Sequence, residues 1–396
     1  MRVALVSSLL PSESAGGAEQ YISQAVDWLT GRHDVYVLSG SPAGALTATE
    51  TVRLPRLVHP RRDEALPRKL VWHLRDQWLP NVHRALVHHL ARIQPDVVWT
   101  HEPQGLSAAP FTAVARLGLP HVHTAHDLNL LCARVTMTKD GRFCGGRCAP
   151  CLVQRAVRAR AAARRLDWLL AVSDYIRERH VSAGVVSSDR AVTLRLGARP
   201  GRARVREGTG PLFRLGYLGG LAQHKGVQTL LTAFRDAPRG WRLTLAGRGE
   251  LAGAVEQAAA SDDRIRALGY VSGEAKEAFF DELDLLVVPS EWEEPATFVA
   301  VEAAIRGIPA LVSDRGGLPE TPEATLFQAG SAADLLRRAR ELADAPGGLA
   351  AASARLLEAR ERFSWSRHME RAEEYLLAAT EPHRRTTKSA RTSKQT

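Results

Sequence analysis

Short apolar runs rich in β-branched residues alternate with amphipathic stretches along almost the whole chain. In the first half this pattern predicts strands at 3–7, 35–38, 97–100, 121–124, 168–172 and 191–194, and helices at 18–30, 70–92, 107–117, 152–165 and 175–183. In the second half it predicts strands at 213–218, 242–246, 265–268, 285–288 and 310–312, and helices at 227–234, 251–260, 274–282, 298–306 and 333–345. Runs such as the one at 96–99 are apolar on both faces, as parallel strands covered by helices are. We therefore expect an α/β protein with two doubly wound, Rossmann-like domains facing a central cleft.

The division of the chain follows from composition. Residues 197–211 are rich in Gly, Pro and Arg, which predicts a linker between a first domain at 1–196 and a second at 212–362. Residues 363–380 form an amphipathic pattern that needs a surface to cover, and we expect this helix to pack back on the first domain. The polar, basic residues 381–396 are predicted to be disordered.

The net charge and the length of the apolar runs limit the kinds of partner and location that we expect for this protein. The 396 residues carry 53 Lys and Arg against 43 Asp and Glu, a net charge of +10. Nine of the basic residues, with one acidic residue, lie at 132–165, and five more, with none, lie after residue 381. The excess is local, so it indicates an anionic acceptor or an anionic membrane surface and not nucleic acid. The chain has no apolar run long enough to span a membrane, and its first ten residues lack a small-x-small cleavage site, so we expect a cytoplasmic protein, peripheral at most at the inner membrane face.

Glycine-rich turns follow several predicted strands. One holds Gly16 and Gly17, one holds Gly219 and Gly220 ahead of Lys225, and one holds Gly247, Arg248 and Gly249. Backbone amides at such turns bind anions, and Lys225 adds a cation where a phosphate would lie. The alternatives are an ordinary tight turn and a surface lysine. There is no Walker sequence, and no acidic residue closes a strand about 20 residues after the third turn, as a nicotinamide site requires.

Two carboxylates, Glu294 and Glu302, follow a strand and the turn Pro289-Ser290. If both lay on one helix, their backbones would be about 12 Å apart, which is too far for a glycosidase pair. The spacing suits one carboxylate in a loop and one on a helix, each bonding a different part of an extended ligand; Glu294 could otherwise only stabilise a helix start. His126 ends a strand of the first domain and is a second candidate at the reaction centre, although a solvated histidine is the alternative.

The four cysteines lie within 20 residues, in a predicted insert at 128–152. Their positions are Cys132, Cys144, Cys148 and Cys151. Four thiolates with glycines between them can hold one zinc ion, so we expect a structural zinc site in preference to labile disulfides or free thiols. A nucleic-acid finger would also need a basic helix with aromatic residues, and few aromatics are present.

Taken together, these motifs resemble the retaining glycosyltransferases of the GT-B type, in particular glycosyltransferase family 4, also called glycosyl transferases group 1. The resemblance covers about residues 1–380 and is most specific at 213–320. It is carried there by the Gly-Gly-Leu-x-x-x-Lys-Gly run at 219–226, the Glu-x7-Glu pair at 294–302 and the Gly316-Gly317 loop.

The resemblance implies an enzyme that moves a sugar from a nucleoside-diphosphate sugar to an acceptor with retention, in the synthesis of a cell-surface glycan, glycoconjugate or natural product. By the same resemblance, His126 and Glu294 would be catalytic. The donor would contact Gly16, Gly17, Gly219, Gly220, Lys225, Gly247, Arg248, Gly249, Glu302, Gly316 and Gly317. Lys225 would pair with the diphosphate, Glu302 would bond the ribose and Glu294 the transferred sugar, and no cofactor would be required. Many relatives have arginine at the position of Gly220, so one diphosphate contact is either missing here or supplied by another residue such as Arg248 or Arg315.

Two other functions share these motifs. One is a nucleotide-sugar epimerase of the same fold, and the other is a sugar-nucleotide-binding protein. The expected partners are a nucleoside-diphosphate sugar and a glycan, lipid-linked or small-molecule acceptor. The sugar, the nucleotide base and the acceptor are not encoded in any motif of this sequence.

Overall fold

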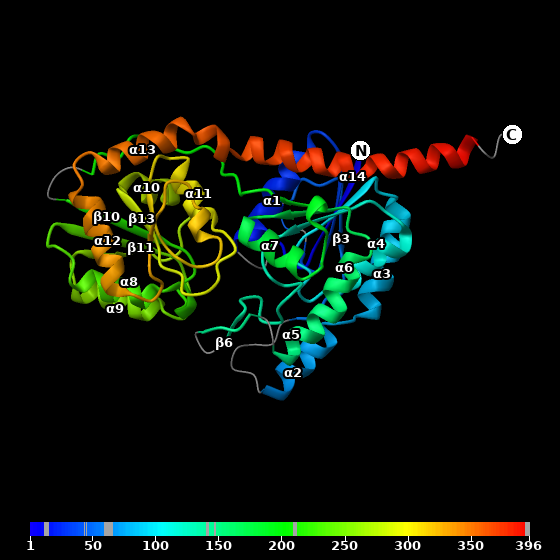
Figure 1. Ribbon diagram of the computed structural model, residues 1–396, viewed down its shortest axis with the longest axis horizontal. Helices are drawn as coiled ribbons and strands as arrows, with labels where there is room; N and C mark the ends of the chain where they lie inside the picture. Colours follow the sequence, from blue (N-terminus) through cyan, green and yellow to red (C-terminus); the bar gives the residue numbers. More distant parts are fainter. Residues whose placement is uncertain are drawn as a thin grey trace. The chain divides into compact units, whose positions relative to one another are not determined.

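The computed structural model describes residues 1–11, 16–42, 44, 46–58, 66–139, 142–145, 148–208 and 212–392. The chain divides into two compact units. Unit 1 comprises Met1–Met137, Cys144–Leu194 and Met369–Thr396, and unit 2 comprises Thr138–Phe143 and Arg195–His368. Each unit is built on one parallel sheet with helices on both faces (Figure 1). The predicted pair of Rossmann-like α/β domains is confirmed.

The sheet of unit 1 has the strand order β3-β2-β1-β4-β5-β8-β9, and all its neighbours are parallel. The strands are β1 (Arg2–Ser7), β2 (Asp34–Ser39), β3 (Glu50–Arg53), β4 (Val97–Thr100), β5 (His121–Ala125), β8 (Trp168–Ala171) and β9 (Ala191–Thr193). The helices are α1 (Gly17–Thr30), α2 (Leu66–Arg75), α3 (Pro80–Ile93), α4 (Ala109–Leu117), α5 (Ala149–Gln154), the π-helical turn η1 (Arg155–Ala159), α6 (Arg160–Ala163), α7 (Asp174–Ser182) and the short η2 (Ser188–Arg190). Strands β6 (Thr138–Lys139) and β7 (Arg142–Phe143) form a small antiparallel hairpin.

The sheet of unit 2 has the order β12-β11-β10-β13-β14-β15, again all parallel. Its strands are β10 (Phe213–Leu218), β11 (Trp241–Ala246), β12 (Ile265–Ala267), β13 (Leu285–Val288), β14 (Ala310–Ser313) and β15 (Thr325–Phe327). Its helices are α8 (Val227–Arg235), α9 (Ala252–Ser261), α10 (Gly273–Glu282), α11 (Phe298–Ala304), α12 (Ala332–Asp344) and α13 (Gly348–Glu358), with short turns η3 (Gln223–Lys225), η4 (Leu318–Glu320) and η5 (Arg360–Phe363).

Strand β13 shows why the sheet of unit 2 is buried on both faces. Leu285 and Val287 pack into one apolar cluster with α8 and α12, whereas Leu286 and Val288 pack into a second cluster with α10 and α11. Successive side chains of a strand point to opposite faces, so four consecutive apolar residues need a helix layer on each side. The carboxyl ends of these strands carry the loops that hold the candidate site.

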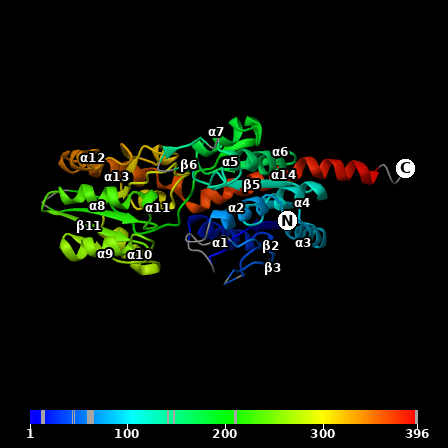
Figure 2. The same ribbon diagram turned by 90° about the horizontal axis from the view of Figure 1, so that it is seen from below.

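The last helix, α14 (Trp365–Thr392), begins in unit 2 and continues in unit 1. Met369, Ala372 and Leu376 are fully buried, and the ring of Tyr375 lies 5.0 Å from that of Trp168 on β8. Residues 381–396 were predicted to be disordered, but the helix runs without interruption to Thr392, and its last turns project beyond the rest of unit 1 (Figures 1 and 2). Extending a helix that is already nucleated costs little, whereas starting one is costly. The last four residues lie outside the described part of the chain.

Three further differences from the predicted elements have simple causes. The single helix expected at 70–92 is two helices, because Pro80 has no amide to donate to the preceding turn and instead begins α3. The edge strands β3 and β15 are short and partly polar, so no apolar run marked them. Part of the predicted linker packs on unit 2: the buried Arg206 donates to the carbonyls of Asp281 (2.8 Å) and Leu283 (3.1 Å).

Candidate active site

The central contact of the site in unit 2 joins Lys225 to Glu294. The Nζ atom of Lys225 donates to both carboxylate oxygens of Glu294, at 2.9 and 2.8 Å. One of these oxygens also accepts from the hydroxyl of Ser290 (2.7 Å) and the indole N–H of Trp292 (2.8 Å). The carboxylate is nearly buried, whereas the lysine is a quarter exposed. The structure thus brings together a cation and a carboxylate that are 69 residues apart in the sequence.

The loop that carries Glu294 is held by hydrogen bonds from the end of β14 and from the turn that follows it. The hydroxyl of Ser313 donates to the carbonyl of Ser290 at 2.5 Å, and the amide of Gly317 donates to the carbonyl of Glu294 at 2.7 Å. Gly316 has a φ of +58°, and a Cβ atom there would lie 2.2 Å from the same carbonyl oxygen. Glycine is required at this close approach, which places the Gly316-Gly317 loop directly against Glu294.

Lys225 is held by a second set of close backbone approaches. It ends η3, and the next residue, Gly226, has a φ of +70° with the carbonyl of Pro289 in the space of its missing side chain. Gly247 has a φ of +147°, and a Cβ there would overlap the carbonyl of Gly219. Gly249 approaches the carbonyl of Leu221 in the same way. The glycine-rich turns after β10 and β11 therefore lie against each other, with Lys225 at the end of the first.

Not every predicted donor residue lies in this contact network. Glu302 is on α11, as the spacing predicted, but its carboxylate accepts from Lys276 of α10 at 2.5 Å. The guanidinium of Arg248 lies over the ring of Tyr270, 4.0 Å from its centre. Arg315 is 3.9 Å from Glu293. A Cβ on Gly220 would meet open space, so no neighbour demands glycine at that position.

The candidates of unit 1 lie where β1, β4 and β5 end. Nε2 of His126 and Nδ1 of His101 are 3.0 Å apart with the rings stacked, and Tyr21 packs edge-on to His126. His101 is buried, and burial holds its pKa well below the ordinary value, so the neutral ring is favoured.

Gly16 caps α1 with a φ of −72°, so the alternative of a left-handed tight turn does not apply at this glycine. A Cβ on Gly16 would lie 2.4 Å from a carboxylate oxygen of Glu19. The first turn of α1, where Gly16 and Gly17 were predicted to receive a phosphate, therefore already has a carboxylate folded over it.

A group of acids in unit 1 was not predicted from the sequence: Glu19 is buried, and Glu102 and Asp127 are partly buried. Burial raises the pKa of Glu102 well above its usual value, and the neighbouring Asp127 and Glu19 raise it further. Burial also raises the pKa of Asp127 to about 6. Glu102 follows His101 directly after β4, so the same rule that selected His126 at the end of β5 would have found it.

The four cysteines are free thiols. The Sγ atom of Cys151 lies 3.2 Å from that of Cys148 and 3.7 Å from that of Cys132. Within the described ranges, no group of three or more His, Cys, Asp or Glu side chains is placed so that it could hold a metal ion. None of the helices described is long and apolar enough to cross a membrane.

Comparison with known families agrees with this geometry. Residues 15–199 match the family model described as Glycosyltransferase Family 4, and residues 213–345 match the one described as Glycosyl transferases group 1. An uncharacterized 42.6 kDa protein of the cps region of Klebsiella pneumoniae is 23% identical over 64% of this chain, and the match spans 66% of that protein. A glycogen synthase of Mycobacterium tuberculosis is 27% identical over 81% of this chain and 80% of its own.

Among solved structures, the Anabaena protein Alr3699/HepE in complex with UDP-glucose superposes with a TM-score of 0.72 and 17% identity, over 96% of this chain and all of that one. At this identity the likeness shows the fold. The two family models between them span both units and include the Lys225–Glu294 contact. The chain is a GT-B glycosyltransferase of the family 4 type.

Proposed function

We propose that this glycosyltransferase moves a sugar from a nucleoside-diphosphate sugar to an acceptor hydroxyl with retention of the anomeric configuration, in the synthesis of a cell-surface glycan or glycoconjugate. The observation that carries the proposal is the contact of Lys225 with Glu294. Support comes from the related fold of HepE, whose structures hold UDP and UDP-glucose, and from the Klebsiella relative of a cps region.

The chemistry follows from an exchange of partners. In the free enzyme the ammonium of Lys225 neutralises the nearly buried Glu294. A diphosphate carries more negative charge than one carboxylate, so it attracts the lysine away and releases the oxygens of Glu294 to accept from sugar hydroxyls. As the glycosidic bond breaks, negative charge grows on the diphosphate, and the ammonium stabilises it in a site with little water. On the acceptor side, His126 and the group of acids in unit 1 would bind and orient the hydroxyl that reacts.

Two substitutions test the exchange. Lys225→Ala removes the cation, and Glu294→Gln keeps the shape while it removes the charge. We expect each to lower turnover of the best nucleoside-diphosphate sugar by about 100-fold or more. The donor is first identified by thermal shift with a panel of nucleotide sugars. The control is Glu341→Gln, which breaks an exposed pair with Arg337 and leaves turnover unchanged. Wild-type turnover in both site variants would contradict the proposal.

Product analysis separates the alternatives. With labelled donor and acceptor, a glycosylated acceptor of unchanged anomeric configuration supports the transferase. An epimerised donor in the absence of acceptor would identify the epimerase, and bound donor that is never converted would identify the binding protein.

The basic stretch at 132–165, which we expect to face an anionic acceptor or membrane, is only partly at the surface. Arg158 is fully buried and forms an ion pair with Asp76, whereas Arg160, Arg164 and Arg165 are exposed. A different surface of unit 1 fits a membrane better. Helix α2 has no acidic residue, carries Arg68, Lys69 and Arg75, and exposes Leu70, Val71 and Leu74 by 53–59%. A basic helix with an exposed apolar face is typical of membrane-surface binding, so we propose a lipid-linked acceptor at a bilayer.

A further inference from the structure

The thiol cluster lies at the start of α5 and draws on two segments of the chain. Cys148 caps this helix, and its carbonyl accepts the amides of Cys151 (2.9 Å) and Leu152 (3.0 Å). Cys132 comes from the segment after β5 and is buried together with Cys151. The cluster therefore joins two segments that are separated in the sequence by the hairpin β6–β7.

Backbone amides point at the sulfurs. The amide of Met137 donates to Sγ of Cys132 at 3.3 Å, and the amide of Arg134 donates to the same sulfur. The amide of Ala133 donates to Sγ of Cys151. Cys148 in addition lies at the positive end of a helix. Amide donors around sulfur stabilise thiolate ligands and fix their direction, so this surrounding favours a cation bound by sulfur.

We propose that Cys132, Cys144, Cys148 and Cys151 bind one zinc ion. Four thiolates at about 2.3 Å from zinc form a tetrahedron with edges of about 3.8 Å. The 3.7 Å between Cys151 and Cys132 already matches an edge. The 3.2 Å between Cys148 and Cys151 is a hydrogen bond between thiols, and it opens by about 0.6 Å when the metal replaces the protons.

Cys144 is the fourth ligand because it is tied to the same turn. Its amide donates to the carbonyl of Met137 at 2.8 Å, and the amide of the same Met137 donates to Sγ of Cys132 at 3.3 Å. In the free chain the described thiols are not placed so that they could hold a metal ion, so zinc binding must draw the four sulfurs together, and it releases up to four protons.

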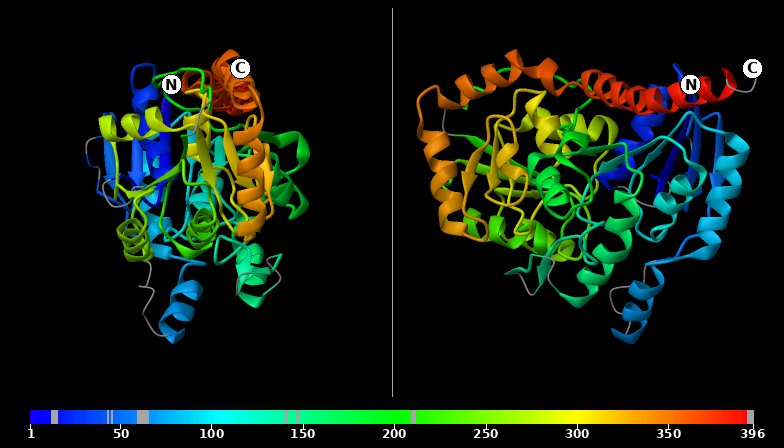
Figure 3. Two further views of the ribbon diagram at one scale, coloured as in Figure 1. Left: turned by 90° about the vertical axis from the view of Figure 1, so that its left-hand side faces the viewer. Right: turned by 45° about the vertical axis from the view of Figure 1, so that its right-hand side comes forward.

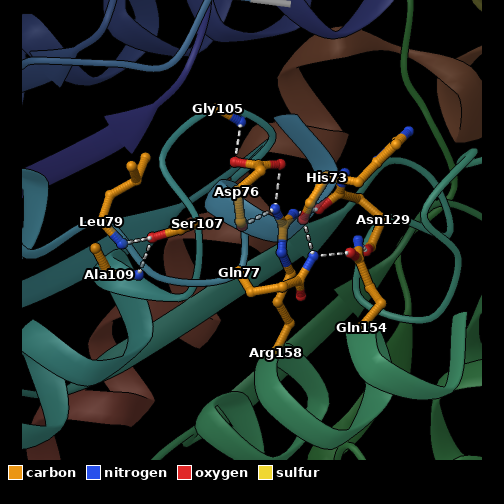
Figure 4. Close-up of polar contacts among 10 residues, drawn as sticks. All are labelled: His73, Asp76, Gln77, Leu79, Gly105, Ser107, Ala109, Asn129, Gln154 and Arg158. Carbon is orange, nitrogen blue, oxygen red and sulfur yellow. Dashed lines mark hydrogen bonds and ion pairs between the residues drawn. The ribbon is translucent and has the colours of Figure 1, made fainter. Parts of the chain in front are cut away.

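The segment that would bind zinc through Cys132 is also held by hydrogen bonds at Asn129. In Figure 4, Arg158 and Gln154 reach Asn129, which lies three residues after His126. Gln154 donates to the carbonyl of Asn129 at 2.5 Å, and Arg158 donates to its side chain and to Asp76. The helical stretch 149–163 thus holds the segment at Asn129, and zinc would hold it again at Cys132. The ion would be structural and would position the segment that carries His126 and Asp127.

The test is the metal content of the purified full-length chain. Elemental mass spectrometry should find about one zinc per chain in the wild type. The double variant Cys148→Ser/Cys151→Ser should contain less than about a tenth of this amount. Leu152→Ala is the matched control, because this side chain follows Cys151 but is 56% exposed, and it should keep the zinc.

Two measurements use the wild type alone, so they test the proposal even if the double variant does not fold. A mercurial that blocks thiols should release zinc in a one-to-one ratio with protein, and hydrogen exchange of residues 126–137 should then increase. Four reactive thiols without metal would overturn the proposal, as would a mass about 2 or 4 Da lower from disulfides. Donor binding at Lys225 is measured separately, so failure of the zinc proposal leaves the proposed transfer reaction untouched.

Discussion

The Glu294 carboxylate accepts from an ammonium, a hydroxyl and an indole, and its own carbonyl accepts an amide from the Gly316-Gly317 loop. A single residue therefore receives contacts from the loops that follow β10, β13 and β14. A shift of any one loop moves the carboxylate, because its oxygens have no spare position in a nearly buried site.

Gly316→Ala should damage the site without touching a charged group. The new methyl would lie 2.2 Å from the carbonyl of Glu294 at a φ of +58°, so the loop must move or unfold locally. We expect a stability loss of about 1–3 kcal/mol and a drop in donor affinity. Urea unfolding and donor titration measure the two effects.

Gly253→Ala provides the matched control. This glycine lies inside α9, and a Cβ atom added to it would have no neighbouring atom within 4 Å, so alanine fits the helix. The substitution should raise stability by about 0.5–1 kcal/mol and leave donor affinity unchanged. Equal effects of the two substitutions would show that the close approach at Gly316 is not what matters.

At this scale, sequence reasoning found the residue types but not their partners. The turns after strands identified Lys225, Glu294 and His126, because parallel strands bring their carboxyl ends to one edge. The pairing of Lys225 with Glu294 spans 69 positions, and the burial of Arg158 depends on Asp76, 82 positions away. No local pattern encodes such distances, so the sequence did not show that Arg158, alone among the arginines of 155–165, is buried.

Helix α2 is the element whose exposed face most needs an explanation. Figure 3 shows it (blue, at the bottom) projecting from unit 1 in both views. Leu70, Val71, Leu74 and the nearby Trp78 are all more than 45% exposed. We expect the protein to bind vesicles that contain anionic lipid, and to release them in high salt, because basic residues accompany the apolar face.

The triple variant Leu70→Gln/Val71→Gln/Leu74→Gln should lower the partition into anionic vesicles at least about tenfold, since each buried aliphatic side chain contributes about 1.5–3 kcal/mol. Leu326→Gln, on β15 of unit 2 and 39% exposed, is the control and should bind as the wild type does. Vesicle flotation measures both variants. Undiminished binding of the triple variant would exclude α2 as the docking surface.

The elements that sequence predicted best are the central strands and the helices that cover them. Their apolar runs are set by burial on both faces, which leaves a clear pattern. The edge strand β3, with Glu50 and Arg53 at its ends, was missed because exposure on one side removes the apolar run. The break before Pro80 was missed because the helical period of apolar residues continues across it. Helix α13 was also missed, in a stretch of small residues.

For the molecule as a whole, buried histidines predict acid sensitivity. Burial lowers the pKa of His121 to about 3 and of His180 to about 4, and holds those of His101 and His123 well below normal. Unfolded histidines bind protons near pH 6.5, so between that value and the folded pKa the unfolded chain binds more protons. Stability should therefore fall as the pH drops from about 7.5 to about 5.

Two partly buried acids, Asp127 and Glu102, oppose this trend. The pKa of Asp127 is raised to about 6, and that of Glu102 is raised as well. Each acid therefore stabilises the folded protein at low pH, and this contribution is lost as the pH rises from the unfolded pKa through the folded pKa. The four histidines outnumber the two acids, so we expect a net loss of stability on acidification. Urea unfolding, together with hydrogen exchange of β4 and β5 in unit 1, should show this loss. It should be smaller in His180→Asn than in a control variant at the exposed His88. Stability that rises on acidification would contradict the assignment.

The discontinuous build of unit 1 has a consequence for synthesis on the ribosome. Met369, Ala372 and Leu376 belong to the core of unit 1 but are translated after all of unit 2. The nascent chain must therefore hold an uncovered apolar surface on unit 1 for the time needed to make about 175 further residues, roughly 10–35 s at about 5–20 residues per second. Unit 2 can therefore finish folding before unit 1, because unit 1 needs α14, which is translated after unit 2.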